Sequence, residues 1–167
     1  MSETQAVRRR WLPSQWPADA AGRKNMALLI QLRWIAIAGQ LVTILIVQFL
    51  MGVRLPLAPM LLVATVAVLV NAASFAALRP RTDITRAELS VSLLFDVLLL
   101  TAQLYLSGGA TNPFVSLYLL QVALGVLLLD RASAWGITAV SALCAGLLAL
   151  DYRPLDLSDR LAGRLFD

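Results

Sequence analysis

The 167-residue sequence contains no histidine, a single cysteine and few charged side chains. Without histidine, these residues cannot supply imidazole acid–base catalysis, a histidine metal ligand or a phosphoacceptor histidine. The one cysteine, Cys144, lies inside an apolar run, so no disulfide framework exists and a core position is expected for it. Charged residues make up 14% of the chain and hydrophobic residues 59%, a composition unlike that of soluble domains. The chain is therefore predicted to lie in a membrane.

Five apolar runs dominate the sequence: Trp34–Met51, Leu57–Leu78, Leu89–Leu106, Phe114–Leu129 and Ala132–Leu150. A helix needs about 20 apolar residues to cross about 30 Å of hydrocarbon, and four runs are near that length. The fold class predicted is an all-α polytopic membrane helix bundle with five spans. The fourth run has 16 residues, or about 24 Å of helix. The turn before it is expected to lie below the lipid headgroups, enclosed by protein or a cavity.

Residues 1–32 are more polar and are expected to form a cytoplasmic N-terminal segment. Trp11 and Trp16 would suit the membrane interface, whereas Pro13 and Pro17 argue against a regular helix there.

Positive charge is distributed unevenly between the two ends of the predicted spans. One side carries ten basic residues: Arg8, Arg9, Arg10, Arg23, Lys24, Arg33, Arg79, Arg81, Arg86 and Arg131. The short loops of the other side carry only Arg54. The positive-inside rule then places the N-terminus in the cytoplasm, and the net charge of +4 follows topology and does not indicate nucleic-acid binding. Residues 33–151 are expected to form the transmembrane domain, and residues 152–167 an extracytoplasmic loop leading to a missing sixth span.

The stretch Ser107–Phe114 is the one place where turn-forming residues interrupt the apolar runs without any charge. Gly108 and Gly109 permit a positive φ, and Asn112 followed by Pro113 is typical of a helix start. The free N–H groups and positive dipole end of that helix would stabilise a ligand carbonyl or an oxyanion in the turn.

The heptapeptide Gly-Gly-Ala-Thr-Asn-Pro-Phe at 108–114 resembles the Gly-Gly-x-x-Asn-Pro-Phe motif of RegB/PrrB-type (ActS/RoxS-like) redox-sensing histidine kinases. The stretch 32–40 resembles the entry of that family's first helix, and Asp96 and Gln103 resemble polar residues of the helix before its motif. The resemblance implies the membrane sensor domain of a two-component histidine kinase in the bacterial inner membrane. In that family the motif lies in a short extracytoplasmic loop and contributes to quinone binding.

Several further expectations follow from the resemblance. The sensed ligand would be ubiquinone, and ATP would bind only to a kinase portion that these residues do not include. The partners implied are lipid, a second copy of the chain and a response regulator, with no nucleic acid. The family's redox-active cysteine lies in its cytoplasmic portion, so Cys144 does not inherit that role.

The site residues implied for ubiquinone are Gly108, Gly109, Asn112, Pro113, Phe114 and Tyr118. A flat ring would stack on Phe114, and a carbonyl would accept from a backbone N–H or the Asn112 amide. Tyr118 and Gln121 follow at helical spacing and are expected on the face of Phe114. The plainer alternative is a tight loop in which Asn112 and Pro113 only cap a helix.

Asp96, Gln103 and Gln121 are polar residues inside predicted spans. A mid-membrane carboxylate costs about 2.5–3.5 kcal/mol, so Asp96 should face a partner, water or a pathway. Asp96 would be part of a polar path or a protonatable group near a quinone. Alternatively, it would be protonated and hydrogen-bonded to a residue such as Asn71 or Gln121. An alternative function is a small transporter or channel-like bundle lined by Asp96, Gln103 and Asn71, although no second copy of the turn pattern is found.

Ala142 and Gly146 form a small-xxx-small pair in the fifth run. Such a pair allows close helix approach, either at a dimer seam or inside the bundle, and packing inside the bundle is favoured.

Overall fold

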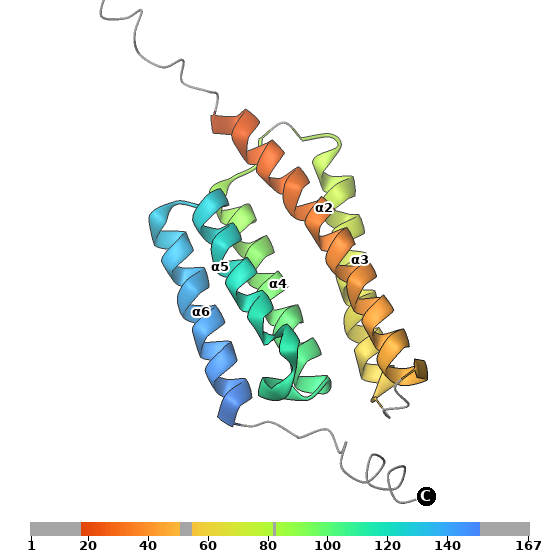
Figure 1. Cartoon of the computed structure of the whole chain (residues 1–167). Coiled ribbons are helices and arrows are strands. Elements are labelled where there is room, and N and C mark those ends of the chain that lie inside the picture. The colour runs from red at the N-terminus through yellow and green to blue at the C-terminus, as the bar shows by residue number, and fades with distance from the viewer. Residues whose placement is uncertain (1–17, 51–54, 82, 151–167) are drawn as a thin grey trace, which may run out of the picture.

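The computed structural model describes residues 18–50, 55–81 and 83–150, and over these residues it is a helical bundle without strands (Figure 1). Its elements are α2 (Ala18–Leu45), η1 (Ile46–Leu50), α3 (Leu57–Leu78), α4 (Arg86–Leu106), η2 (Gly109–Thr111), η3 (Pro113–Ser116), α5 (Leu117–Leu128) and α6 (Arg131–Leu150). Four of the described helices are long and apolar enough to cross a membrane, and Pro113–Leu128 is a shorter apolar helix. The all-α bundle predicted from the five runs is confirmed.

The first helix begins much earlier than the apolar run predicts. Within the described residues it runs from Ala18 and continues through the boundary expected near residue 33. The helix therefore includes residues 18–33, ahead of the apolar run predicted to start at Trp34. The alanine, leucine and lysine of this stretch are good helix formers. Trp11, Trp16 and the tail at 152–167 lie outside the described residues.

Local capping sets the starts of two other helices. At the start of α4, the Thr85 hydroxyl accepts from the Glu88 N–H at 3.2 Å while the Glu88 carboxylate accepts from the Thr85 N–H at 2.9 Å. This capping box extends the helix three residues before the predicted Leu89. At α6, Asp130 accepts from the Ser133 hydroxyl at 2.9 Å and from its N–H at 3.4 Å. These bonds hold the pKa of Asp130 below its ordinary value.

The helices form two groups: α2 lies beside α3, and α4, α5 and α6 pack together (Figure 1). Leu89, Leu93, Val97 and Leu104 of α4 are almost completely buried, so α4 is the centre of the core. The outer surface is apolar, and Leu119, Leu127 and Leu150, among others, are largely exposed. A surface of this kind is stable in lipid and not in water. The chain is therefore a multi-pass membrane protein.

Candidate functional site

The uncharged turn between α4 and α5 needs glycine at two consecutive positions. Gly108 has a φ of 111° and Gly109 a φ of 60°, both in the region that L side chains rarely adopt. Both residues are buried. The prediction of a glycine-dependent turn is confirmed, and the two glycines shape the backbone without lining the adjoining cavity.

Asn112 holds the turn together through three side-chain bonds. Its Oδ1 accepts from the Phe114 N–H at 2.9 Å, and its Nδ2 donates to the carbonyl and the hydroxyl of Ser107 at 3.0 and 2.6 Å. The Ser107 hydroxyl in turn donates to the Gln103 carbonyl at 2.8 Å. Asn112 therefore caps η3 as predicted, with Pro113 at its first position.

These bonds correct the expectation of an open donor site at the helix start. The N–H of Phe114 is bonded to Asn112 Oδ1, and the N–H of Val115 to the Asn112 carbonyl at 3.1 Å. Both N–H groups, and the Asn112 amide, already have acceptors inside the turn. The unbonded donors on the cavity wall belong to other side chains, Gln40 and Gln103.

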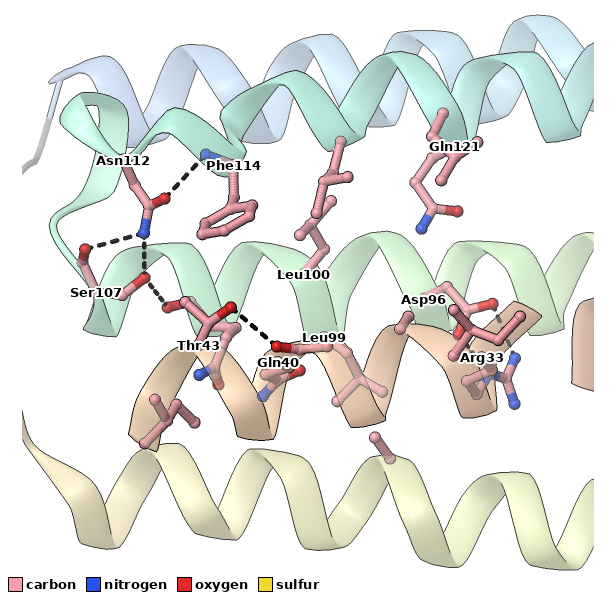
Figure 2. Close-up of a pocket in the computed structure, with 18 of the residues that line it drawn as sticks. Arg33, Gln40, Thr43, Asp96, Leu99, Leu100, Ser107, Asn112, Phe114 and Gln121 are labelled. Carbon is pink, nitrogen blue, oxygen red and sulfur yellow. Dashed lines mark hydrogen bonds and ion pairs between the residues drawn. The ribbon is translucent and has the colours of Figure 1, made fainter. Parts of the chain in front are cut away.

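A cavity of about 970 Å³ extends from this turn between α2 on one side and α4 and α5 on the other (Figure 2). Its wall is mostly apolar, and Ile35, Phe114 and Leu120 on the wall are also exposed at the lipid-facing surface. The polar side chains on the wall are Arg33, Gln40, Thr43, Asp96, Gln103, Ser107, Thr111, Asn112 and Gln121. The volume is within the range of about 300–1,000 Å³ that is typical of small-molecule sites.

Phe114 and Gln121 line the cavity, but Tyr118 does not. Tyr118 is 5% exposed, and its hydroxyl lies 2.7 Å from the Thr101 hydroxyl in the core. The prediction that Tyr118 shares the face of Phe114 is wrong because Phe114 stands in η3. In a 3₁₀ segment residues three apart eclipse, so Leu117 and not Tyr118 continues the stripe of Phe114.

A buried ion pair forms the far polar group of the cavity. Arg33 Nε lies 2.6 Å from Asp96 Oδ1, and Arg33 Nη2 lies 2.9 Å from Oδ2. The two side chains are only 5% and 13% exposed, and Arg33 Nη2 also donates to the Ser92 hydroxyl at 2.8 Å. Figure 2 shows the pair at the end of the cavity away from the turn.

This pair corrects two predictions. The partner of Asp96 is Arg33, not Asn71 or Gln121. Arg33 was counted among the basic residues that flank the first span, but its side chain lies inside the bundle, level with the middle of α4. The other nine basic residues on that side still outnumber Arg54 on the opposite side, so the predicted orientation is unchanged.

Asn71 is fully buried and donates to the Ile30 carbonyl at 3.1 Å, which joins α3 to α2. It is not on the cavity wall, whereas Asp96 and Gln103 are. The bundle therefore does not form a transport path lined by Asp96, Gln103 and Asn71.

Three glutamines on the cavity wall have buried polar atoms without a protein partner. These atoms are Gln40 Nε2, Gln103 Nε2 and Oε1, and Gln121 Oε1. Buried amide groups without a partner are unusual and mark a place where a ligand can bond. The sequence analysis did not predict Gln40 as a site residue. The signal that could have found it is helical spacing: Gln40 follows Arg33 by seven residues, as Gln103 follows Asp96 by seven.

Gln103→Leu is expected to stabilise the ligand-free bundle by about 1 kcal/mol, because it removes a buried amide that has no partner and keeps a similar volume. Unfolding of the ligand-free chain in mixed micelles, followed by circular dichroism, measures the change. A loss of stability would mean that the amide is bonded within the bundle.

Two predictions concern α6. Cys144 is a buried core residue, as expected. The small pair Ala142 and Gly146 is exposed, and a Cβ at Gly146 would have no atom within 4 Å apart from the neighbouring backbone of α6 itself. The prediction that this pair packs inside the bundle is wrong, because its helix turns the pair to the outer surface. The dimer seam stays a prediction.

Comparison with known proteins identifies the domain. Residues 17–163 match the model of the family described as the PilS-like transmembrane domain. The chain is also 34% identical over 138 residues to the sensor histidine kinase RegB of Cereibacter sphaeroides, a match that covers 81% of this chain and 29% of the kinase. No solved structure matches the chain. The chain therefore belongs to the PilS-like transmembrane domain family and is a RegB-type membrane sensor domain.

Proposed function

We propose that this domain binds ubiquinone in the cavity beside the turn and relays the redox state of the quinone pool to a histidine kinase. The chain spans less than a third of the RegB kinase that it resembles, and the kinase portion would bind ATP and phosphorylate a response regulator. The domain would lie in the bacterial inner membrane with its N-terminus in the cytoplasm, as the distribution of basic residues indicates.

One observation carries the proposal: the cavity combines an exposed aromatic ring with buried amides that have no partner. Phe114 offers a flat face for a quinone ring, since stacked rings attract one another beyond their burial. Gln40 Nε2 and Gln103 Nε2 can donate to a quinone carbonyl. The exposed Ile35 and Leu120 mark a lipid-facing rim through which an isoprenoid tail can leave.

Signalling requires that a ligand state favour one helix arrangement over another. The cavity lies between α2 on one side and α4 and α5 on the other. A ligand in the cavity therefore acts directly on how α2 packs against these two helices. A change in that packing is what an attached kinase, present as a homodimer, would register.

Phe114→Ala is expected to reduce bound ubiquinone at least about tenfold. The quinone ring loses its stacking partner, and its binding free energy becomes less favourable by about 1.5 kcal/mol or more. Extraction of the purified chain and chromatography of the released quinone measure the occupancy. Phe75→Ala is the matched control, since Phe75 is 45% exposed on α3 and Phe114 is 43% exposed. Equal occupancy in the two variants would contradict the proposed site.

A further inference from the structure

Arg33 has a buried donor that its ion pair does not use. The Asp96 carboxylate faces Nε and Nη2 of the guanidinium, at 2.6 and 2.9 Å, and Nη2 also donates to the Ser92 hydroxyl at 2.8 Å. Nη1 lies on the other side of the planar guanidinium and has no partner among the described residues. A buried N–H without an acceptor is unusual and marks a place where a ligand can bond. Because Asp96 balances the charge, a neutral oxygen suits this place.

The cavity has a second group of unbonded donors near the turn. Gln40 Nε2 and Gln103 Nε2 are buried there and have no acceptor. Gln40 follows Arg33 by seven residues on α2, so the two side chains leave the same face of the helix about 10 Å apart. Figure 2 shows them at separate places along the cavity, with Leu99 of α4 between them.

The separation of the two donor groups matches one kind of ring. The oxygens of a para-quinone lie about 5 Å apart across the ring, and a hydrogen bond of about 3 Å at each end puts the two donors about 11 Å apart. The oxygens of an ortho-quinone are neighbours, about 3 Å apart. An ortho-quinone of the same size therefore reaches only one of the two donor groups.

We propose that the cavity selects para-quinones, because one ring oxygen accepts from Gln40 or Gln103 and the opposite oxygen accepts from Arg33 Nη1. The inference rests on the proposed function, that the cavity binds ubiquinone, which is itself a para-quinone. The ring then lies lengthwise along α2, over the apolar wall between the two donor groups, and Phe114 stacks against the end nearer the turn. The ion pair fixes the guanidinium, and Nη1 determines which quinones fit.

The para and ortho isomers of naphthoquinone test the proposal, because they differ only in the position of one oxygen. Competition with decylubiquinone for the chain in lipid nanodiscs gives an inhibition constant for each isomer. The unmodified chain is expected to bind the para isomer about tenfold more tightly, the effect of one hydrogen bond. Arg33→Lys keeps a cation beside Asp96 but removes Nη1, and is expected to bring the two constants within about twofold of each other. The double variant Gln40→Leu, Gln103→Leu removes the donors near the turn and is expected to do the same.

Gln31→Leu is the matched control, because Gln31 is exposed on α2 and is not on the cavity wall, so the tenfold preference should remain. A variant that only loosens the bundle weakens both isomers together and leaves the ratio unchanged. Should Arg33→Lys not fold, the double variant carries the same test.

Equal binding of the two isomers to the unmodified chain, or a preference that persists in Arg33→Lys, overturns the inference. If either result occurs while Phe114→Ala still weakens decylubiquinone, only this inference fails. If the unmodified chain binds no decylubiquinone, the proposed function fails as well.

Discussion

Asp96→Ala is expected to lower the free energy of unfolding of the bundle by about 3–5 kcal/mol, because it leaves the buried Arg33 without an anion. The guanidinium is 5% exposed and makes two contacts with the carboxylate, at 2.6 and 2.9 Å. After the substitution, the hydroxyl and the carbonyl of Ser92 are the hydrogen-bonding partners that remain for Arg33 among the described residues. Thermal or detergent-induced unfolding of the purified chain, followed by circular dichroism, measures the loss.

The double variant Arg33→Met, Asp96→Leu separates the cost of an unpaired charge from the value of the pair. It is expected to stay within about 1 kcal/mol of the unmodified chain, since apolar groups of similar volume often replace a buried pair without loss. The control is Arg81→Gln, which breaks the Arg81–Glu88 pair, whose side chains are 53% and 35% exposed. An exposed pair contributes at most about 1 kcal/mol. A loss in Asp96→Ala no larger than in Arg81→Gln would contradict the prediction.

The elements that sequence predicted well are those that depend on local chemistry. The span Leu57–Leu78 coincides with α3 because an apolar run is bounded by Pro56 and Arg79. The turn follows from the conformations that Gly108 and Gly109 allow. Neither result needs any knowledge of which helices meet.

The elements that sequence missed depend on long-range contact or on the detailed form of a helix start. Arg33 and Asp96 are 63 residues apart, and only the packing of α2 against α4 makes them partners. The sequence does not say whether the first turn after Asn112 is 3₁₀ or α. This difference changes the angle around the helix between Phe114 and Tyr118, so the prediction that they share a face was wrong. The unbonded amides of Gln40 and Gln103 are likewise a property of the assembled cavity.

Asn112→Ala is expected to lower the free energy of unfolding by about 2–3 kcal/mol, the largest effect among substitutions in the turn. It removes the cap on the Phe114 N–H, worth about 1 kcal/mol, and two bonds to Ser107, worth about 0.5–1.5 kcal/mol each. Asn112→Ser keeps a capping oxygen but is too short to reach Ser107, so about half the loss is expected. Ser107→Ala removes the contact of the hydroxyl with Asn112 Nδ2 and its bond to the Gln103 carbonyl, and should cost about 1 kcal/mol. Unfolding in mixed micelles measures all three.

The same three variants distinguish a positioning role for Asn112 from direct contact with the ligand. If Asn112 only positions η3, ubiquinone occupancy should fall in proportion to stability across the series, because Phe114 moves as the turn loosens. Occupancy that collapses in Asn112→Ser while stability is largely kept would contradict that role. The Asn112 amide would then turn from Ser107 to the quinone on binding, and the donor for the ring carbonyl would be Asn112 in place of Gln40 or Gln103.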